Sequence, residues 1–504
     1  MRRIFLTLAA LIAGPVLGAQ PGDPHLNPVP RTDEEVARIA RAVEPTTDFS
    51  NPEAFEANSA GAATVRPGVL ARAFSGRSST IDLERGLDFE VGHGLFEKLW
   101  VSSPSSTLAS DGLGPVYNAR SCERCHVNAG RGHPPESTRD SNVSMLVRLS
   151  IPAGGSEEDD AIKGDLNALP EPNYGWQLQD LSIAGMPAEG RFSIAYEEIP
   201  ISLSDGETAT LRKPSYTLTN LAHGPLHPKA MLSPRVAQQM IGLGLLDAIP
   251  AADILAQADP EDADGNGISG RAQFVRSREF GTLMLGRFGH KAGQPSLREQ
   301  TASAFHGDIG ISSTLFPEGY GDCTPSQARC RAAPDGNTDI HDNAEIGDEA
   351  LDLVLFYTAN LAVPARRNVG DPSVLHGKRV FYETGCIHCH TPKFVTHRIP
   401  DRPEHSFQLI WPYSDLLLHD MGPGLADNRP EAVANGREWR TPPLWGIGLT
   451  QQVSGHTYFL HDGRARSLLE AVLWHGGEAE TQRQRVVEMP KSDRDALVKF
   501  LESL

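Results

Sequence analysis

Apolar residues recur at helical spacing in several segments of the chain. We expect helices over residues 83–100, 350–362, 374–382 and 492–504. In the last segment Leu497, Phe500 and Leu504 fall on one face. Ser492 and Asp495 resemble the capping box that begins a helix. The sequence therefore predicts a C-terminal helix that packs by an apolar stripe.

A second pattern, in which apolar and polar residues alternate, covers residues 145–151 and 191–201. Alternation with a period of two predicts short strands or hairpins. Both segments lie in a long stretch, roughly residues 140–340, which we expect to be inserted into the first domain. The chain also has 48 Gly and 38 Pro, so we expect many irregular connections around compact helical units.

Composition adds limits on the class of protein. A length of 504 residues allows two to four domains of about 100–200 residues each. Hydrophobic residues make up 39% and charged residues 22%, with a mean hydropathy of -0.32, as in soluble globular proteins. The formal charge is -18, from 46 Lys and Arg against 64 Asp and Glu, so we expect no nucleic-acid partner.

The N-terminus has the pattern of an export signal. Arg2 and Arg3 precede an apolar stretch over residues 4–13, and Gly18 and Ala19 form a small-residue cleavage site. We interpret residues 1–19 as a cleaved signal peptide. The stretch is too short to span a bilayer, so we expect a periplasmic protein without a stable membrane anchor.

The cysteines point to a cofactor. Of the six, four lie in two C-x-x-C-H motifs, formed by Cys122, Cys125 and His126 and by Cys386, Cys389 and His390. Two thiols at this spacing can add to the vinyl groups of haem, and the adjoining histidine can bind the iron as proximal ligand. A redox C-x-x-C pair or a zinc pair is the alternative, but neither requires histidine at the fifth position. The motifs therefore predict two covalently bound c-type haems.

Cys323 and Cys330 remain. Their segment reads as a loop, and in an oxidising compartment a local disulfide is the simplest interpretation. A redox-active pair is the alternative.

These features predict a mainly α fold with two cytochrome c-like haem domains, the first carrying long loop and β insertions. After the signal peptide we expect an N-terminal extension over residues 20–80. The N-terminal haem domain then covers residues 81–345, and the C-terminal haem domain covers residues 346–504.

The chain resembles a known family in several segments. These are residues 113–115 and 129–132 beside the first haem motif, 287–289 (RFG), 413–422 (YSDLLLHDMG) and 459–464 (FLHDGR). They are similar to the di-haem oxidoreductase family, which belongs with the bacterial di-haem cytochrome c peroxidases and MauG-type enzymes. The resemblance covers the chain from about residue 83 to residue 504.

The resemblance implies different roles for the two haems. The N-terminal haem, with His126 as proximal ligand, corresponds to the peroxidatic haem. The C-terminal haem, with His390, corresponds to the electron-transfer haem, and His475 aligns with its sixth ligand. The alternative is that His475 is a surface histidine at a helix end.

The resemblance also implies residues beside the peroxidatic haem. Relatives place a glutamate there about ten residues after a glutamine, and this chain has Asp308 after Gln300. Asp308 is thus the candidate acid/base and Gln300 its hydrogen-bonding partner. The alternative is that Asp308 caps a helix. Where relatives carry a tryptophan between the haems, this chain has His290, which could bond a propionate or reach the iron.

A calcium ion is the other inorganic expectation. Residues 262–270 place carboxylate and amide oxygens on alternate positions among glycines, which suits a hard cation. A glycine-rich turn with self-capping Asp is the alternative. Relatives hold an inter-haem calcium through an Asn and a Thr-x-Pro segment, which resemble Asn266, Thr441 and Pro443.

The function that the resemblance implies is reduction of hydrogen peroxide, with electrons from a small c-type cytochrome or another periplasmic donor. A MauG-like enzyme, which would oxidise a protein or an organic substrate, is one alternative. An electron-transfer cytochrome without a substrate is another, with Met145 or His133 as sixth ligand of the first haem.

Overall fold

The structure is a computed structural model that describes residues 22–107, 109–136, 144–153 and 167–504. The predicted signal peptide, residues 1–19, lies outside the described residues. The helices are α1 (Asp33–Val43), α2 (Gly86–Glu97), α4 (Leu243–Asp247), α5 (Ala251–Leu255), α6 (Leu297–Ala304), α7 (Ala328–Arg331), α8 (Asp348–Ala359), α9 (Pro372–Thr384), α10 (Gly422–Leu425), α11 (Thr450–Ser454), α12 (Leu468–Leu473), α13 (Glu480–Glu488) and α14 (Lys491–Ser503). In this described part of the chain, every helix is too short or too polar to cross a membrane.

The strands form several small antiparallel sheets. They are β1 (Val116–Tyr117) with β4 (Leu181–Ser182), β2 (Met145–Pro152) between β3 (Ala168–Leu169) and β7 (Met231–Val236), β5 (Arg191–Ser202) with β6 (Thr208–Thr219), β8 (Phe274–Arg276) with β9 (Leu283–Leu285), β10 (Phe394–Val395) with β11 (Leu409–Ile410), and β12 (Leu418–Asp420) with β13 (Glu438–Arg440).

The prediction of a mainly α fold is therefore wrong, because the structure has 31% helix and 18% strand. The long inserted stretch contributes much of the strand, above all the twelve-residue strands β5 and β6. Glycine and proline also interrupt the helical segments, which keeps most helices short. The predicted strands at 145–151 and 191–201 do form, as β2 and β5, and the predicted helices form as α2, α8, α9 and α14.

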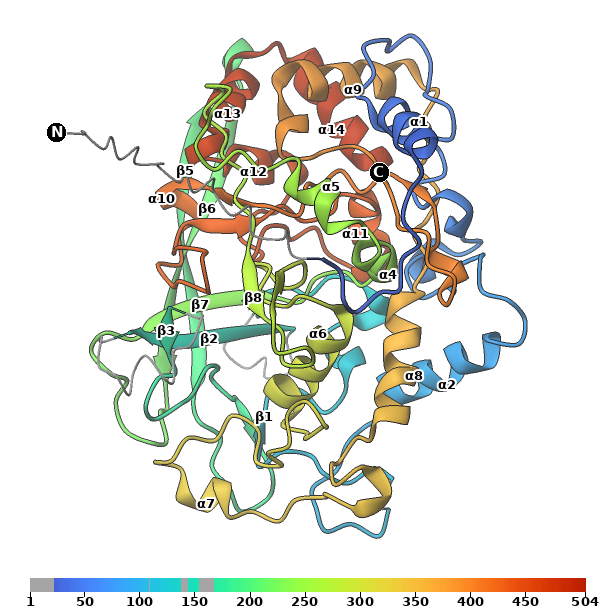
Figure 1. The fold of residues 1–504 in the computed structure, drawn as a ribbon. Helices are drawn as coiled ribbons and strands as arrows, with labels where there is room; N and C mark the ends of the chain where they lie inside the picture. The colour runs from blue at the N-terminus through green and yellow to red at the C-terminus, as the bar shows by residue number, and fades with distance from the viewer. Residues whose placement is uncertain (1–21, 108, 137–143, 154–166) are drawn as a thin grey trace, which may run out of the picture.

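Two apolar clusters make up most of the core: one joins α2, α4, α6 and α8, and the other joins α9, α12 and α14. Helices α2 and α8 lie in the lower half of Figure 1, and α9 and α14 lie in the upper half. In the lower half α2 and α6 pack on α8. A Cβ on Gly92 of α2 would lie 2.1 Å from the backbone oxygen of Leu353, so glycine is what lets α2 and α8 approach this closely. Helix α8 follows the predicted domain boundary between residues 345 and 346, yet it packs on α2 and α6, which precede that boundary. The position of the boundary stays a prediction.

In the upper half α9 packs on α14 and α13, and α12 packs on both of these helices. Asp371 caps α9 by accepting a hydrogen bond from the Ser373 backbone, and Pro372 occupies the first helical position. The helix ends at Gly385, whose φ of 93° suits glycine and turns the chain into Cys386. Helix α14 begins after Pro490 without a side-chain cap, so the predicted capping box does not form.

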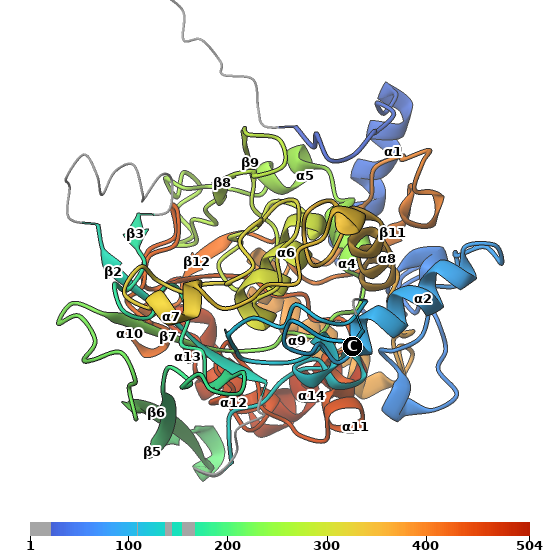
Figure 2. The ribbon, with the colours of Figure 1, turned by 90° about the horizontal axis from the view of Figure 1, so that it is seen from below.

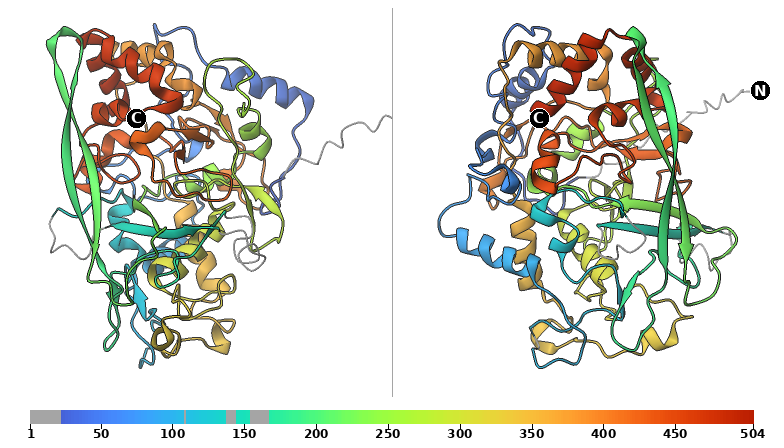
Figure 3. Two further views of the ribbon diagram at one scale, coloured as in Figure 1. Left: turned by 90° about the vertical axis from the view of Figure 1, so that its left-hand side faces the viewer. Right: turned by 180° about the vertical axis from the view of Figure 1, so that it is seen from behind.

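The long hairpin of β5 and β6 runs along the outside of the molecule from the β2–β7 sheet to the C-terminal helices (Figure 3). Near its tip Glu207 forms ion pairs with Arg494 and Lys491 of α14. Seen from below, α6 lies between the β2–β7 sheet and the α2–α8 pair (Figure 2). The β5–β6 hairpin therefore connects the two halves of the molecule.

Candidate functional site

The first C-x-x-C-H motif opens into a cavity of about 740 Å³, called here the first cavity. Cys122 begins a 3₁₀ turn over Cys122–Arg124, and Cys125 and His126 follow it. The residues predicted for this site all line the cavity: Cys122, Cys125, His126, Gln300 and Asp308. Segments far apart in the sequence thus meet around one space.

His126 is held by its backbone surroundings. Its Nδ1 lies 2.8 Å from the carbonyl oxygen of Gln238, and a carbonyl can only accept, so Nδ1 donates. Burial lowers the pKa of His126, which keeps the ring neutral at pH 7. With Nδ1 engaged, Nε2 is the ring nitrogen left to bind a metal. This anchoring of one nitrogen is typical of histidine ligands.

The second motif lies beside a smaller cavity of about 250 Å³, the second cavity, lined by Cys386, Cys389 and His390. The motif again forms a 3₁₀ turn, over Cys386–His388. His390 Nδ1 donates to the carbonyl oxygen of Tyr413 at 2.9 Å, and burial lowers the pKa of His390 to about 4. Both motifs therefore present a neutral imidazole through Nε2.

His475 lines the same second cavity. It follows α12, and its Nδ1 donates to the Ala471 carbonyl oxygen at 2.7 Å. Burial lowers the pKa of His475 as well. A positive charge on His475 would lower the pKa of His390, so the two rings favour each other's neutral form. The alternative of a surface histidine does not fit this position. The second cavity thus holds two neutral, anchored imidazoles, a donor set that suits a six-coordinate haem iron.

Asp308 lies on a π-helical turn over Phe305–Ile309, which follows α6 directly. Single π turns inside helices are frequent at functional sites. Its Oδ1 accepts a hydrogen bond of 2.9 Å from Nε2 of Gln177, a fully buried residue from the inserted region. The same Gln177 amide donates to Asn118 Oδ1. The carboxylate is thus oriented in the first cavity by a side chain that sequence patterns did not single out.

His306 is a second residue that the sequence analysis missed. It lines the first cavity two positions before Asp308, and its ring stacks on Phe316. Its Nδ1 is buried and has no hydrogen-bond partner among the described residues. Burial lowers the pKa of His306 to about 4, so the ring is neutral. No motif in the sequence surrounds it, and only the stacked geometry reveals it.

His290 lines both cavities. Its Nε2 donates to the Val236 carbonyl oxygen at 2.9 Å, and its Nδ1 accepts from Gln238 Nε2 at 2.9 Å. Both ring nitrogens are therefore engaged within the protein, in place of the suggested contact with a propionate or iron. Burial keeps the pKa of His290 well below its ordinary value. His290 is thus a neutral, hydrogen-bonded side chain that lies between the two cavities.

The four motif cysteines are free thiols in buried surroundings. Burial raises the pKa of Cys122 and of Cys386 to about 12. Redox-active or zinc-binding cysteines need thiolates, which a lowered pKa provides. Protonated thiols disfavour a redox-active pair, whereas a bound zinc ion would itself deprotonate its ligands, so these pKa shifts do not decide the zinc alternative.

The suggested calcium ligands lie in different surroundings. Asn266 lies in an exposed loop, where its Oδ1 accepts from the Ile268 backbone. Asp259, Asp262 and Asp264 gather in the same loop. The Thr441 carbonyl accepts from Ser414 Oγ and Arg440 Nη1. Pro443 lines the second cavity. The shared calcium ion stays a prediction, and the carboxylates of Asp259, Asp262 and Asp264, whose ligand atoms lie within 4.8 Å of one another, form a group that could hold a metal ion.

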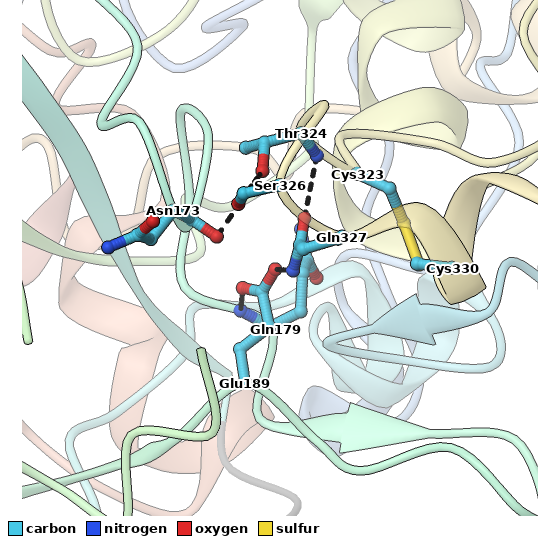
Figure 4. Close-up of a disulfide and its surroundings, with 8 residues drawn as sticks. All are labelled: Asn173, Gln179, Glu189, Cys323, Thr324, Ser326, Gln327 and Cys330. Carbon is cyan, nitrogen blue, oxygen red and sulfur yellow. Dashed lines mark hydrogen bonds between the residues drawn. A yellow bond between two sulfur atoms is a disulfide. The ribbon is translucent and has the colours of Figure 1, made fainter. Parts of the chain in front are cut away.

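The predicted disulfide is confirmed: Cys323 and Cys330 are bonded, with Cα atoms 6.1 Å apart (Figure 4). Both are buried. Gln327, between them, donates to Glu189 of the inserted region and accepts from the Thr324 backbone. The bond therefore staples a loop against the insertion, away from the cysteines that line the cavities.

Two cavities, each with a C-x-x-C-H motif and an anchored neutral histidine, define a protein built to hold a pair of haems. Comparison with family models agrees: residues 55–504 match the family described as "Di-haem oxidoreductase, putative peroxidase". The chain belongs to this family, and membership implies haem cofactors.

Other comparisons add little. No curated protein matches the chain. Among solved structures, hydrazine synthase of Kuenenia stuttgartiensis matches with 14% identity, over 47% of this chain and 78% of that chain, at a TM-score of 0.22. A likeness this low carries no argument about fold or function.

Proposed function

We propose that the protein is an exported di-haem c-type peroxidase that reduces hydrogen peroxide at the first cavity, with electrons supplied through the second. Cys122 and Cys125 would hold one haem by thioether bonds, and Cys386 and Cys389 the other. His126 and His390 would be the proximal ligands. The signal peptide over residues 1–19 and the haem chemistry both favour the periplasm, since thioether formation follows export.

The observation that carries the proposal is the difference between the two cavities. Asp308, oriented by Gln177, lines the first cavity. His475 lines the second, where an anchored imidazole suits a six-coordinate electron-transfer site. The Asp308 carboxylate in the first cavity supports proton transfer there, and the anchored His475 imidazole in the second supports electron storage there.

The overall reaction is H₂O₂ + 2 H⁺ + 2 e⁻ → 2 H₂O. Haem iron, when bound, supplies the redox chemistry that breaks the O–O bond. Asp308 moves a proton from one peroxide oxygen to the other, which turns the leaving oxygen into water. Gln177 holds the carboxylate through Oδ1, and Gln300 offers a further hydrogen bond in the same cavity. The electrons come from a small c-type cytochrome or another periplasmic donor.

Steady-state turnover tests this function. The purified holoprotein, mixed with hydrogen peroxide and a reduced small c-type cytochrome, is expected to oxidise two cytochromes for each peroxide consumed. Peroxide consumption without cytochrome oxidation would contradict the assigned donor class. No consumption at all, by protein that holds both haems, before or after reduction by one electron, would contradict the proposal.

His475→Ala is expected to change the spin state of one haem. Loss of an imidazole ligand leaves the second iron five-coordinate, so a low-spin ferric signal should become high-spin and sensitive to cyanide. Electron paramagnetic resonance measures this change. His133→Ala is the matched control, since the His133 ring bonds the Pro134 carbonyl and lies tilted against the His456 ring. An unchanged low-spin signal in His475→Ala would remove the ligand assignment.

An electron-transfer cytochrome without turnover is the second candidate, and Met145 is the observation that favours it. This buried residue lines the first cavity, where its thioether is a haem ligand type. His133 is not favoured, because its ring packs on His456. Two low-spin haems in every redox state would support the carrier, whereas a high-spin ferric signal that cyanide removes would support the enzyme.

The disulfide should have no part in this chemistry. Its cysteines are separated by 7 positions, and opening so short a loop is expected to lower the free energy of unfolding by about 2.5 kcal/mol. Urea unfolding of the Cys323→Ser/Cys330→Ser variant measures this loss. Peroxide turnover is expected to stay at the level of the unaltered protein. Loss of turnover in a folded variant would instead support the redox-active alternative.

A further inference from the structure

Arg440 occupies a singular position between the two cavities. It ends β13, is only 5% exposed and lines the second cavity. Its backbone N–H donates to the His290 carbonyl oxygen at 3.0 Å. Its guanidinium contacts Gly289 and Gln238, both of which line the two cavities. Arg440 therefore lies where the two sites meet.

The guanidinium is bound only by neutral oxygens. Nε donates to the Gly289 carbonyl at 2.9 Å, Nη1 to the Thr441 carbonyl at 3.0 Å, and Nη2 to Gln238 Oε1 at 3.0 Å. In the described part of the chain, these three uncharged oxygens are its hydrogen-bond acceptors. Burial lowers the pKa of Arg440, with Asp415 opposing, to about 10, so the group stays charged at pH 7. A buried cation that makes no direct ion pair acts strongly on nearby charge.

On the side of the first cavity, one residue, Gln238, connects Arg440 to the proximal histidine by hydrogen bonds. The Gln238 side chain accepts from Arg440 Nη2, and the Gln238 carbonyl accepts from Nδ1 of His126. The Gln238 amide also donates to His290. Gln238 thus holds Arg440 and His126 in a fixed relation.

On the side of the second cavity, a similar set of hydrogen bonds connects Arg440 to His390. The Thr441 carbonyl accepts from both Arg440 Nη1 and Ser414 Oγ. Ser414 follows Tyr413, whose carbonyl accepts from Nδ1 of His390. A continuous series of hydrogen bonds and adjacent residues therefore joins the two proximal histidines, with Arg440 at its centre.

We propose that Arg440 is a positioning residue that supplies one fixed positive charge to both haem sites, from a position next to Thr441, one of the suggested calcium ligands. Reduction removes one positive charge from each haem, so a nearby cation stabilises the reduced form of both. The Thr441 carbonyl oxygen, one of the suggested calcium ligands, accepts a hydrogen bond from the guanidinium. The inference rests on the two haems of the proposed function, but not on peroxide as substrate.

Redox titration of the holoprotein, followed optically and without peroxide, tests the inference. Arg440→Gln, which keeps two haems, is expected to lower the midpoint potentials of both. Arg440→Lys, which keeps the charge, is expected to restore most of both potentials. A shift of one potential alone, no shift, or equal shifts in the Gln and Lys variants would overturn the proposal.

A second measurement needs no variant. Removal of calcium from the unaltered holoprotein with a chelator is expected to leave both midpoint potentials unchanged, because the charge between the sites belongs to Arg440. A fall of both potentials on chelation, reversed by added calcium, would overturn the proposal. Neither experiment involves turnover, so failure of the peroxidase assignment would be recognised separately.

Discussion

Replacement of Cys122 and Cys125 together by serine is expected to leave a protein with one covalently bound haem and no measurable peroxide turnover. A hydroxyl cannot form the thioether, and the anchored His126 supplies only one bond to the iron. The cavity of about 740 Å³ that these residues line would then lose its cofactor. Haem content by pyridine haemochrome assay and intact mass measure the result.

The matched variant, Cys386→Ser/Cys389→Ser, is expected to lose the other haem. It should retain the high-spin signal of the first site but no longer oxidise the reduced cytochrome at the original rate. The Cys323→Ser/Cys330→Ser variant serves as control, since it alters the same number of cysteines and should keep both haems. Two covalent haems in Cys122→Ser/Cys125→Ser would contradict the attachment sites.

Asp308→Asn is expected to lower kcat/KM for hydrogen peroxide by about 10²–10⁴-fold, the usual contribution of a positioned acid/base. The substitution is nearly isosteric. The asparagine oxygen can still accept from Gln177 Nε2, so the hydrogen bond and the shape of the cavity are preserved. What disappears is the group that carries the proton between the two peroxide oxygens. Stopped-flow measurement of the first reaction with peroxide separates this step from electron supply.

Two comparison variants make this result specific. Gln177→Leu removes the group that orients the carboxylate, so a smaller loss is expected, with Asp308 still present. His306→Gln removes the neutral imidazole on the same π-helical turn and should change the rate little. Full activity of Asp308→Asn together with a large loss in His306→Gln would transfer the acid/base role to His306.

Local features of the chain were predictable from its sequence. The C-x-x-C-H motifs located both cavities, because the attachment chemistry fixes residue type and spacing within five positions. Helical and alternating patterns located α2, α9 and β5 within a few residues. His475 and Asp308 came from the resemblance to the family, and both line the cavities to which it assigned them.

Features that depend on long-range packing were not predictable. The fold class was wrong, since no local pattern gives the extent of pairing between β5 and β6 or the number of small sheets. No motif marks Arg440, the residue to which we assign the charge between the cavities, because only the packed structure brings its guanidinium to Gly289 and Gln238. Gln177 orients Asp308 across a sequence separation of 131, beyond any spacing rule.

The central claim is that the exported chain carries two haems joined by thioether bonds, and intact mass spectrometry under denaturing conditions tests it most directly. Denaturation removes any haem that is held only by ligation. The account predicts the mass of a chain beginning at Gln20 plus two haems, with both adducts on peptides that contain residues 122–126 and 386–390. A mass equal to the polypeptide alone would contradict it.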